Sequence, residues 1–145
     1  MESVMGTRLG RAMAGGLAGT LVMTAMMYFV APMMMGMPMD IAAMLGSMLG
    51  GSWAAGMAMH FMLGTAVFPA LYALVLYPKL PGAPAMRGAL WGVALWLMAQ
   101  LVVMPMMGGG LFSSQMGGMM AAVSSLLGHL VYGGILGAIA GAPER

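Results

Sequence analysis

The sequence predicts an all-α fold, in which residues 1–145 form one domain, a bundle of four transmembrane helices. Composition is the first reason, because 62% of the residues are hydrophobic and 6% are charged, whereas a soluble domain carries about 25% charged residues. A chain this short cannot hide so much apolar surface from water. The other reasons are four apolar runs of spanning length and the placement of every basic residue on one side of them. We therefore expect the lipid bilayer to surround the protein.

Four apolar segments are long enough to cross the hydrocarbon core of a bilayer, which takes about 20 residues of helix. They are Ala12–Ala31, Trp53–Tyr77, Gly88–Met107 and Ala121–Ala140. Pro69 interrupts the second segment, and no charged residue occurs between positions 88 and 143. The even number of spans places both termini on the same side of the membrane.

The basic residues predict which side that is. They precede the first span, lie in the connector between the second and third spans, or follow the fourth span: Arg8, Arg11, Lys79, Arg87 and Arg145. Lysine and arginine are retained on the cytoplasmic side of bacterial membrane proteins. We expect a multi-pass protein of the bacterial inner membrane with both termini in the cytoplasm and the two Met-rich connectors outside.

A short helix is predicted in the first connector, over residues 41–50. Asp40 stands where an N-cap is expected, and Gly50-Gly51 would end the helix. The apolar residues share one predicted face at positions i, i+3, i+4, i+7 and i+8, namely Ile41, Met44, Leu45, Met48 and Leu49. The opposite face would carry Ala42, Ala43, Gly46, Ser47 and Gly50. Such a helix is too short to span the membrane and is expected to lie at its interface.

The two halves of the chain resemble each other, which predicts an internal repeat of residues 11–77 and 87–141. Arg11 and Arg87 open the first span of each half, and a glycine, Gly16 or Gly92, follows five residues later. A Pro-Met-Met stretch closes that span in both halves. Because each unit contains two spans, the copies would be related by a pseudo-twofold axis along the membrane normal.

The chain contains two histidines, and each opens a His-x-x-x-Gly pattern in the second span of its half. The patterns are His60-Phe-Met-Leu-Gly64 and His129-Leu-Val-Tyr-Gly133. An ionisable side chain within a membrane segment is a functional-site hypothesis by default. Repeat symmetry places both histidines at the same depth, and the glycines four residues away indicate a face that packs against other helices. We expect the two imidazoles to approach each other in the outer half of the bundle.

Three interpretations of the histidine pair remain open at this point. In the first, each imidazole makes an interhelical hydrogen bond with a buried polar partner, for which the spans offer Thr20, Thr24, Tyr28, Gln100 and Ser125. In the second, His60 and His129 are the axial ligands of one haem b, and Gly64 and Gly133 make room for the macrocycle.

In the third interpretation the site handles copper, because thioethers are the soft ligands that select Cu(I). The chain contains 24 methionines. A first cluster lies just outside span one: Met33, Met34, Met35, Met37 and Met39. A second cluster follows span three: Met104, Met106, Met107 and Met116.

Several function classes are disfavoured by what the sequence lacks. The three acidic residues, Glu2, Asp40 and Glu144, all lie outside the predicted spans, and neither a nucleophile triad nor a phosphate loop is present. We expect no enzyme activity. Five unclustered basic residues do not indicate nucleic-acid binding. The sequence instead favours a non-catalytic accessory or assembly subunit of a larger inner-membrane complex, with membrane-protein partners or self-association.

The segment Gly128-His-Leu-Val-Tyr-Gly-Gly-Ile-Leu-Gly137 resembles the last helix of a family of small, uncharacterised bacterial four-helix membrane proteins. The matching arrangement of spans covers about residues 10–141. This resemblance implies the four-helix fold and an inner-membrane location, and it implies no activity.

Overall fold

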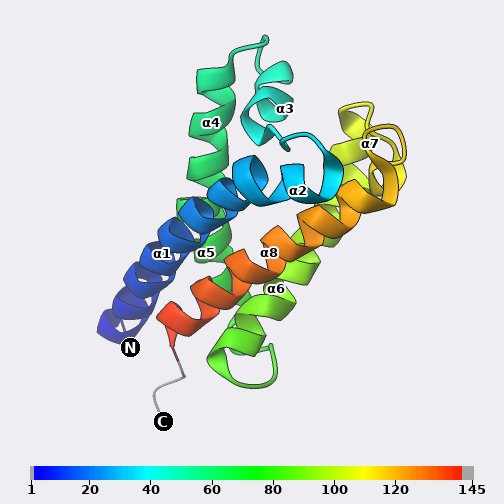
Figure 1. Ribbon diagram of the computed structural model, residues 1–145. Coiled ribbons are helices and arrows are strands. Elements are labelled where there is room, and N and C mark those ends of the chain that lie inside the picture. The colour runs from blue at the N-terminus through cyan, green and yellow to red at the C-terminus, as the bar shows by residue number, and fades with distance from the viewer. Residues whose placement is uncertain (1, 142–145) are drawn as a thin grey trace.

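The computed structural model describes residues 2–141, and every regular element among them is a helix. Four helical stretches are long and apolar enough to cross a membrane: span 1 (Arg8–Met35), span 2 (Trp53–Leu76), span 3 (Pro84–Met106) and span 4 (Gly118–Ala140). The predicted all-α, four-span fold is therefore confirmed. Figure 1 shows that the first turn of span 1 and the last turn of span 4 lie at the same end of the bundle.

Three of the four spans are built from several helical segments. Span 1 comprises α1 (Glu2–Ala25), the π-helix η1 (Met26–Val30) and α2 (Ala31–Met35). Span 2 comprises α4 (Trp53–Met62), the π-helix η2 (Leu63–Val67), α5 (Phe68–Leu71) and the π-helix η3 (Tyr72–Leu76). Span 3 comprises α6 (Pro84–Met98), the π-helix η4 (Ala99–Val103) and α7 (Met104–Met106). Span 4 is the uninterrupted helix α8 (Gly118–Ala140). The connectors contain α3 (Ile41–Ser47) and the 3₁₀ turn η5 (Leu111–Ser113).

Prolines explain the π-helical segments. Each of the four in residues 2–141 ends two residues before a proline: Pro32, Pro69, Pro78 or Pro105. Proline has no N–H, and its ring clashes with the carbonyl one turn earlier. Widening the preceding turn relieves that clash and is a local adjustment by which membrane helices accommodate proline. Span 4 contains no proline and stays a regular α-helix.

One carbonyl that lacks a donor because of a proline accepts a hydrogen bond from another helix. In η2 the Phe68 N–H donates to the Leu63 carbonyl, five residues back. The same register would assign the Gly64 carbonyl to the N–H of residue 69, which proline lacks. The Tyr132 hydroxyl on α8 donates to the Gly64 carbonyl instead, at 2.7 Å. This bond keeps a polar backbone group paired inside the apolar bundle.

Glycines bring the backbones of neighbouring helices together in both halves of the chain. A Cβ on Gly133 of α8 would collide with the Gly88 carbonyl of α6, and a Cβ on Gly16 of α1 would collide with the Gly64 carbonyl of η2. This small-residue packing is the usual way in which membrane helices approach closely. The π-helices η1 and η4 also occupy corresponding places in the two halves. The parallel repeat itself stays a prediction.

The connector helix α3 begins as predicted and packs differently from the prediction. The Asp40 carboxylate accepts a hydrogen bond from the Ala43 N–H at 2.9 Å, which confirms the N-cap. The helix ends at Ser47 rather than Gly50.

The predicted faces of this helix are partly wrong. The residues buried on α3 are Ala42, Leu45 and Gly46, whereas Met48 and Leu49 are exposed. Gly56 of α4 explains this, because its missing side chain lets the α3 backbone come close at Ala42 and Gly46. Small residues therefore fill the contact with α4 in place of the larger apolar ones.

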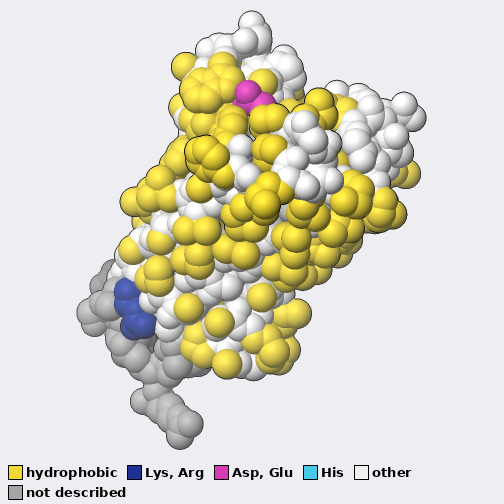
Figure 2. All heavy atoms as spheres, in the orientation of Figure 1, with side chains coloured by type: hydrophobic (Ala, Val, Ile, Leu, Met, Phe, Trp, Pro, Cys, Tyr) yellow, Lys and Arg dark blue, Asp and Glu magenta, His cyan; other side chains and the backbone are white. Residues whose placement is uncertain are grey.

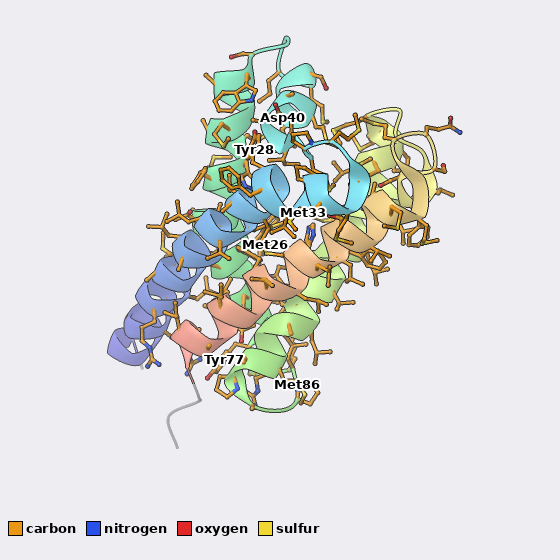
Figure 3. The ribbon with its side chains drawn as sticks, in the orientation of Figure 1. Met26, Tyr28, Met33, Asp40, Tyr77 and Met86 are labelled. Carbon is orange, nitrogen blue, oxygen red and sulfur yellow. The ribbon has the colours of Figure 1, made fainter. Side chains whose placement is uncertain are left out.

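Charged side chains lie near the two ends of the bundle and hydrophobic ones cover the region between them. In Figure 2, the basic side chains visible on this face lie near the end where α1 begins, and an acidic side chain lies near α3 at the other end. Asp40 is that acidic residue (Figure 3). At the basic end, the Arg8 guanidinium carbon lies 4.5 Å from the centre of the Tyr77 ring. This distribution is that of a multi-pass membrane protein.

Candidate functional site

A cavity of about 130 Å³ lies inside the bundle, and all four spans and α3 contribute to its wall. Both histidines line it, His60 from α4 and His129 from α8. Ile41, Met44 and Leu45 of α3 line it as well. The structure therefore brings the predicted pair to one partly open space.

Hydrogen bonding fixes which ring nitrogen of His60 carries the proton. The Thr24 hydroxyl lies 2.6 Å from the Thr20 carbonyl, to which it donates its single hydrogen. The Nε2 of His60 lies 3.0 Å from the same hydroxyl oxygen, so Nε2–H is the donor there. His60 Nδ1 consequently carries a lone pair. Because Thr24 belongs to span 1, the predicted interhelical hydrogen bond is confirmed for His60.

His129 is protonated on its other nitrogen. Its Nδ1 lies 2.8 Å from the Ser125 carbonyl oxygen, and because a carbonyl can only accept, Nδ1–H is the donor. The lone pair is therefore on Nε2. The prediction of an interhelical bond is wrong for His129, because the regular turn of α8 places the Ser125 carbonyl of its own helix within reach of the ring.

Each imidazole is thus oriented through one nitrogen and has the other unprotonated. Among the hydrogen bonds between described residues, none involves His60 Nδ1 or His129 Nε2. A histidine whose N–H is held by a hydroxyl or a carbonyl, and whose second nitrogen is free, has the arrangement of a metal-ligating histidine.

Methionines are concentrated on the wall of this cavity. They make up 7 of its 21 lining residues, compared with 24 of 145 in the chain, so their share there is twice that in the sequence. They come from spans 1 and 3, from α3 and from the adjoining loops: Met23, Met27, Met39, Met44, Met98, Met104 and Met107.

The structure divides the methionine clusters that the sequence suggested as ligands. Of the first cluster only Met39 lines the cavity, whereas Met33 is 85% and Met37 58% exposed. Met34 lies in a separate crevice, and Met35 packs beside Gly117. Met33, Met34 and Met35 are consecutive residues of α2 and therefore point to different sides of the helix. Gly36, whose φ is +75°, then turns the chain before Met37 and Met39.

Two members of the second cluster, Met104 and Met107, line the cavity, and two, Met106 and Met116, are exposed. Sequence reasoning missed Met23, Met27, Met44 and Met98. The sequence of span 1 could have indicated two of them, because Met23 and Met27 follow Thr20 on the helical face that begins at Gly16.

The remaining polar groups of the wall are largely occupied, and none is charged. The Thr20 hydroxyl donates to the Gly16 carbonyl at 2.7 Å, and the Tyr132 hydroxyl donates to Gly64. The Gln100 side-chain oxygen accepts from the Ser113 hydroxyl at 2.8 Å. Among the described residues, no aspartate, glutamate, lysine or arginine lines the cavity. The wall therefore presents nitrogen lone pairs and thioether sulfurs without a formal charge.

Haem does not fit this site. A cavity of about 150 Å³ accommodates benzene, and a porphyrin is several times larger. The glycines predicted to make room for it are already in close contact with protein: Gly133 lies against α6, and the Thr20 side chain occupies the space beside Gly64. Helix packing, rather than a macrocycle, accounts for both glycines.

The Asp40 carboxylate, which caps α3, has a structural role separate from the cavity. Asp40 accepts hydrogen bonds from the Tyr28 hydroxyl at 2.8 Å and from the Trp53 indole at 3.1 Å, in addition to the Ala43 N–H. Partial burial alone would raise the pKa of Asp40, but these hydrogen bonds lower it further than burial raises it. Asp40 thus links span 1 to the start of span 2 and does not line the cavity.

Comparison with protein families matches residues 6–144 to a family of unknown function, DUF6789. The chain belongs to this family. The match covers all four spans and both histidines, so the cavity lies within the family domain. Comparisons with curated proteins and with solved structures gave no match. Within residues 2–141, no group of three or more histidine, cysteine or acidic side chains is placed to hold a metal ion.

Proposed function

We propose that this DUF6789 protein binds Cu(I) in the cavity between its four spans, with His60 and His129 as nitrogen ligands and one or two wall methionines as sulfur ligands. The observation that carries the proposal is the pair of imidazoles in a Met-rich cavity, each held by its protonated nitrogen and free at the other. Neutral imidazole and thioether together suit Cu(I), because thioether sulfur is a soft ligand.

The absence of charge on the wall favours a monovalent ion. The Born cost of transferring an ion into an apolar medium rises with the square of its charge. Zn²⁺ is usually bound by carboxylates, by thiolates or by three imidazoles, whereas the described residues on this wall provide two imidazoles and no carboxylate or thiolate. Cu(I) has a single positive charge and is bound well by neutral donors.

The test is a titration of the purified protein with Cu(I) under anaerobic, reducing conditions, with bicinchoninate as the competing chelator. We expect one Cu(I) per chain and an X-ray absorption spectrum with both nitrogen and sulfur ligands. His60→Leu and His129→Leu should each weaken binding at least tenfold, which corresponds to about 1.4 kcal/mol or more. Met62→Leu is the matched control, because Met62 is 53% exposed on span 2 and does not line the cavity.

Three results would contradict the proposal. Cu(I) binding with unchanged affinity in the variant lacking both histidines would place the copper elsewhere. A reduced haem spectrum that is lost in the same variant would replace copper by haem. A folded protein that binds neither would reduce the histidine pair to helix packing.

We propose further that the protein acts without catalysis, as an accessory or assembly subunit of a larger complex of the bacterial inner membrane. Within α1, Gly15, Gly16 and Gly19 are covered by other helices, whereas a Cβ on Gly6 or Gly10 would meet no other atom of the described residues within 4 Å. Exposed small residues at this spacing favour contact with another transmembrane helix, from a partner or a second copy.

Two measurements test this wider role. Because the chain has no cysteine, Gly10→Cys provides a unique site for cross-linking in native membranes, and Gly134→Cys on α8 is the control. We expect specific adducts at Gly10 only, and Gly10→Ile should abolish the association. The proposed cytoplasmic termini predict that a reporter fused at Arg145 is active only when that reporter functions in the cytoplasm.

A further inference from the structure

A second, smaller space lies beside the cavity, between the end of span 1 and α8. It is a crevice of about 20 Å³, enough for about one water molecule. Four residues line both the crevice and the cavity, namely Met23, Met27, Met39 and Ser125. The two spaces therefore adjoin along these four residues.

Methionines also dominate the crevice. They supply 5 of its 11 lining residues, and two of these, Met26 and Met34, do not line the cavity. Met33 follows on the surface and is 85% exposed. In Figure 3, Met26 and Met33 both project from the end of span 1 where it crosses α8. Thioethers thus follow one another from the surface at α2 through the crevice to the cavity wall.

The crevice adjoins the part of span 1 that departs from α-helical geometry. Met26, Met27 and Val30 belong to the π-helix η1, and Met34 belongs to α2. The opposite side is α8 at Gly128, which contributes no side chain. A Cβ at Gly128 would lie 3.4 Å from a side-chain carbon of Met23, an ordinary contact distance. The gap is therefore just wide enough for one methyl group.

We propose that this crevice is the entrance through which Cu(I) reaches the cavity, an inference that rests on the proposed function. Met34 and Met26 receive the ion near the surface and transfer it to the shared methionines Met23, Met27 and Met39. In each step one copper–sulfur bond forms as another breaks, copper stays Cu(I), and no proton or electron is transferred. Methionine suits this exchange because its unbranched side chain is flexible and its sulfur is polarizable.

The experiment separates the rate of loading from the affinity of the site. Cu(I) is supplied as its bis-bicinchoninate complex under anaerobic conditions, and loss of the complex's colour is followed by stopped flow. Gly128→Ala narrows the crevice without removing a thioether, and Gly128→Val narrows it further. Gly134→Ala and Gly134→Val on the same helix are the matched controls, because a Cβ at Gly134 would meet no other atom within 4 Å.

We expect loading to slow at least tenfold in Gly128→Val and by a smaller factor in Gly128→Ala, with equilibrium affinity within twofold of the original protein. The double variant Met26→Leu with Met34→Leu should also slow loading and leave the affinity unchanged. Leucine is similar in size to methionine, so this variant removes the thioethers while the crevice keeps its size. Met119→Leu with Met120→Leu is the control for exposed methionines, because both side chains are exposed and neither lines the crevice.

Each outcome decides a different claim. Unchanged loading rates in the Gly128 and methionine variants overturn the entrance and leave the copper site standing. Loss of affinity in parallel with rate also overturns the entrance, because it makes these residues part of the site itself. If the original protein binds no Cu(I), the proposed function fails, and the entrance fails with it.

Discussion

Span 2 and span 4 carry one histidine each, but the two spans differ in helix geometry and in how they hold the imidazole. Span 2 contains Pro69, is followed by Pro78 and includes two π-helical segments, whereas α8 is uninterrupted over 23 residues. His60 donates its proton across to span 1, and His129 donates its proton to a carbonyl of its own helix. The outcome is nonetheless the same, since each imidazole has its other nitrogen unprotonated and lines the shared cavity. The local helix geometry therefore determines how each ring is held.

The helix contacts beneath the histidines differ in a similar way. Gly133 of α8 packs directly on the backbone of α6 at Gly88 and Gly92. Gly64 of span 2 packs on a side chain, that of Thr20. A side chain can rotate away from an intruding atom, but two backbones can only move apart together with their helices. The second hairpin, spans 3 and 4, should therefore tolerate a side chain at its glycine contact less well than the first hairpin, spans 1 and 2.

The largest predicted effect tests this contrast. Gly133→Ala should destabilise the protein by about 3 kcal/mol, because its methyl group would force α6 and α8 apart. Gly64→Ala should cost about 1 kcal/mol, because Thr20 can rotate although it then loses its bond to Gly16. Unfolding of both variants in mixed detergent and SDS micelles measures the difference. Equal losses would show that the two contacts do not differ as the structure indicates.

A smaller effect is expected where α8 compensates for the irregularity of span 2. Tyr132→Phe removes the hydroxyl that pairs with the Gly64 carbonyl and should cost about 1–2 kcal/mol, in the range of buried hydrogen bonds. Pro69→Ala restores an N–H to residue 69. It should therefore cost less in the Tyr132→Phe background than in the original protein.

A double-mutant cycle with these two substitutions, measured by the same unfolding assay, gives the coupling directly. Strictly additive losses would mean that the hydroxyl does not replace the missing N–H. Tyr28→Phe is a useful comparison, because its hydroxyl bonds to Asp40, which keeps its bonds to Ala43 and Trp53.

Sequence predicted the features that depend on one residue or on a long pattern. Hydropathy alone located the four spans, since each apolar run is as long as the membrane is thick. Asp40 was identifiable as an N-cap because that role requires only its position relative to residue 43. Helical spacing from glycine also placed both histidines inside the bundle.

Features that depend on contacts between helices escaped prediction. The proline positions were visible, but the π-helical segments before them follow from how each freed carbonyl finds a partner, as Gly64 does with Tyr132. The buried face of α3 was mispredicted because Gly56 of another helix determines it. Candidate ligand methionines were predicted in the dense run that begins at Met33. The cavity wall instead contains single methionines from separate helices, such as Met23 and Met98.

The smallest predicted effect concerns the first hairpin, spans 1 and 2, at the end near α3, where Asp40 joins the two spans and α8 takes no part. Because the hydrogen bonds hold the pKa of Asp40 below its ordinary value, the folded state gains stability above the ordinary carboxyl pKa, about 4. That gain is lost as the pH falls through the lowered pKa. We expect the contribution of Asp40, measured as the difference in stability between the original protein and Asp40→Asn, to be constant from pH 7 to pH 5 and to fall by at most about 1 kcal/mol below pH 4.

Hydrogen exchange locates this loss within the chain. After correction for intrinsic exchange rates, peptides covering residues 40–56 should lose more protection between pH 5 and pH 3 in the original protein than in Asp40→Asn, whereas peptides covering residues 118–140 should not differ between the two proteins. Asp40→Asn can still cap α3 but cannot titrate, so its 40–56 segment should show no pH dependence in this range. A difference of equal size between the two proteins in α8 would show that the effect of Asp40 is not confined to the first hairpin. It would also mean that the two hairpins unfold as one unit rather than separately.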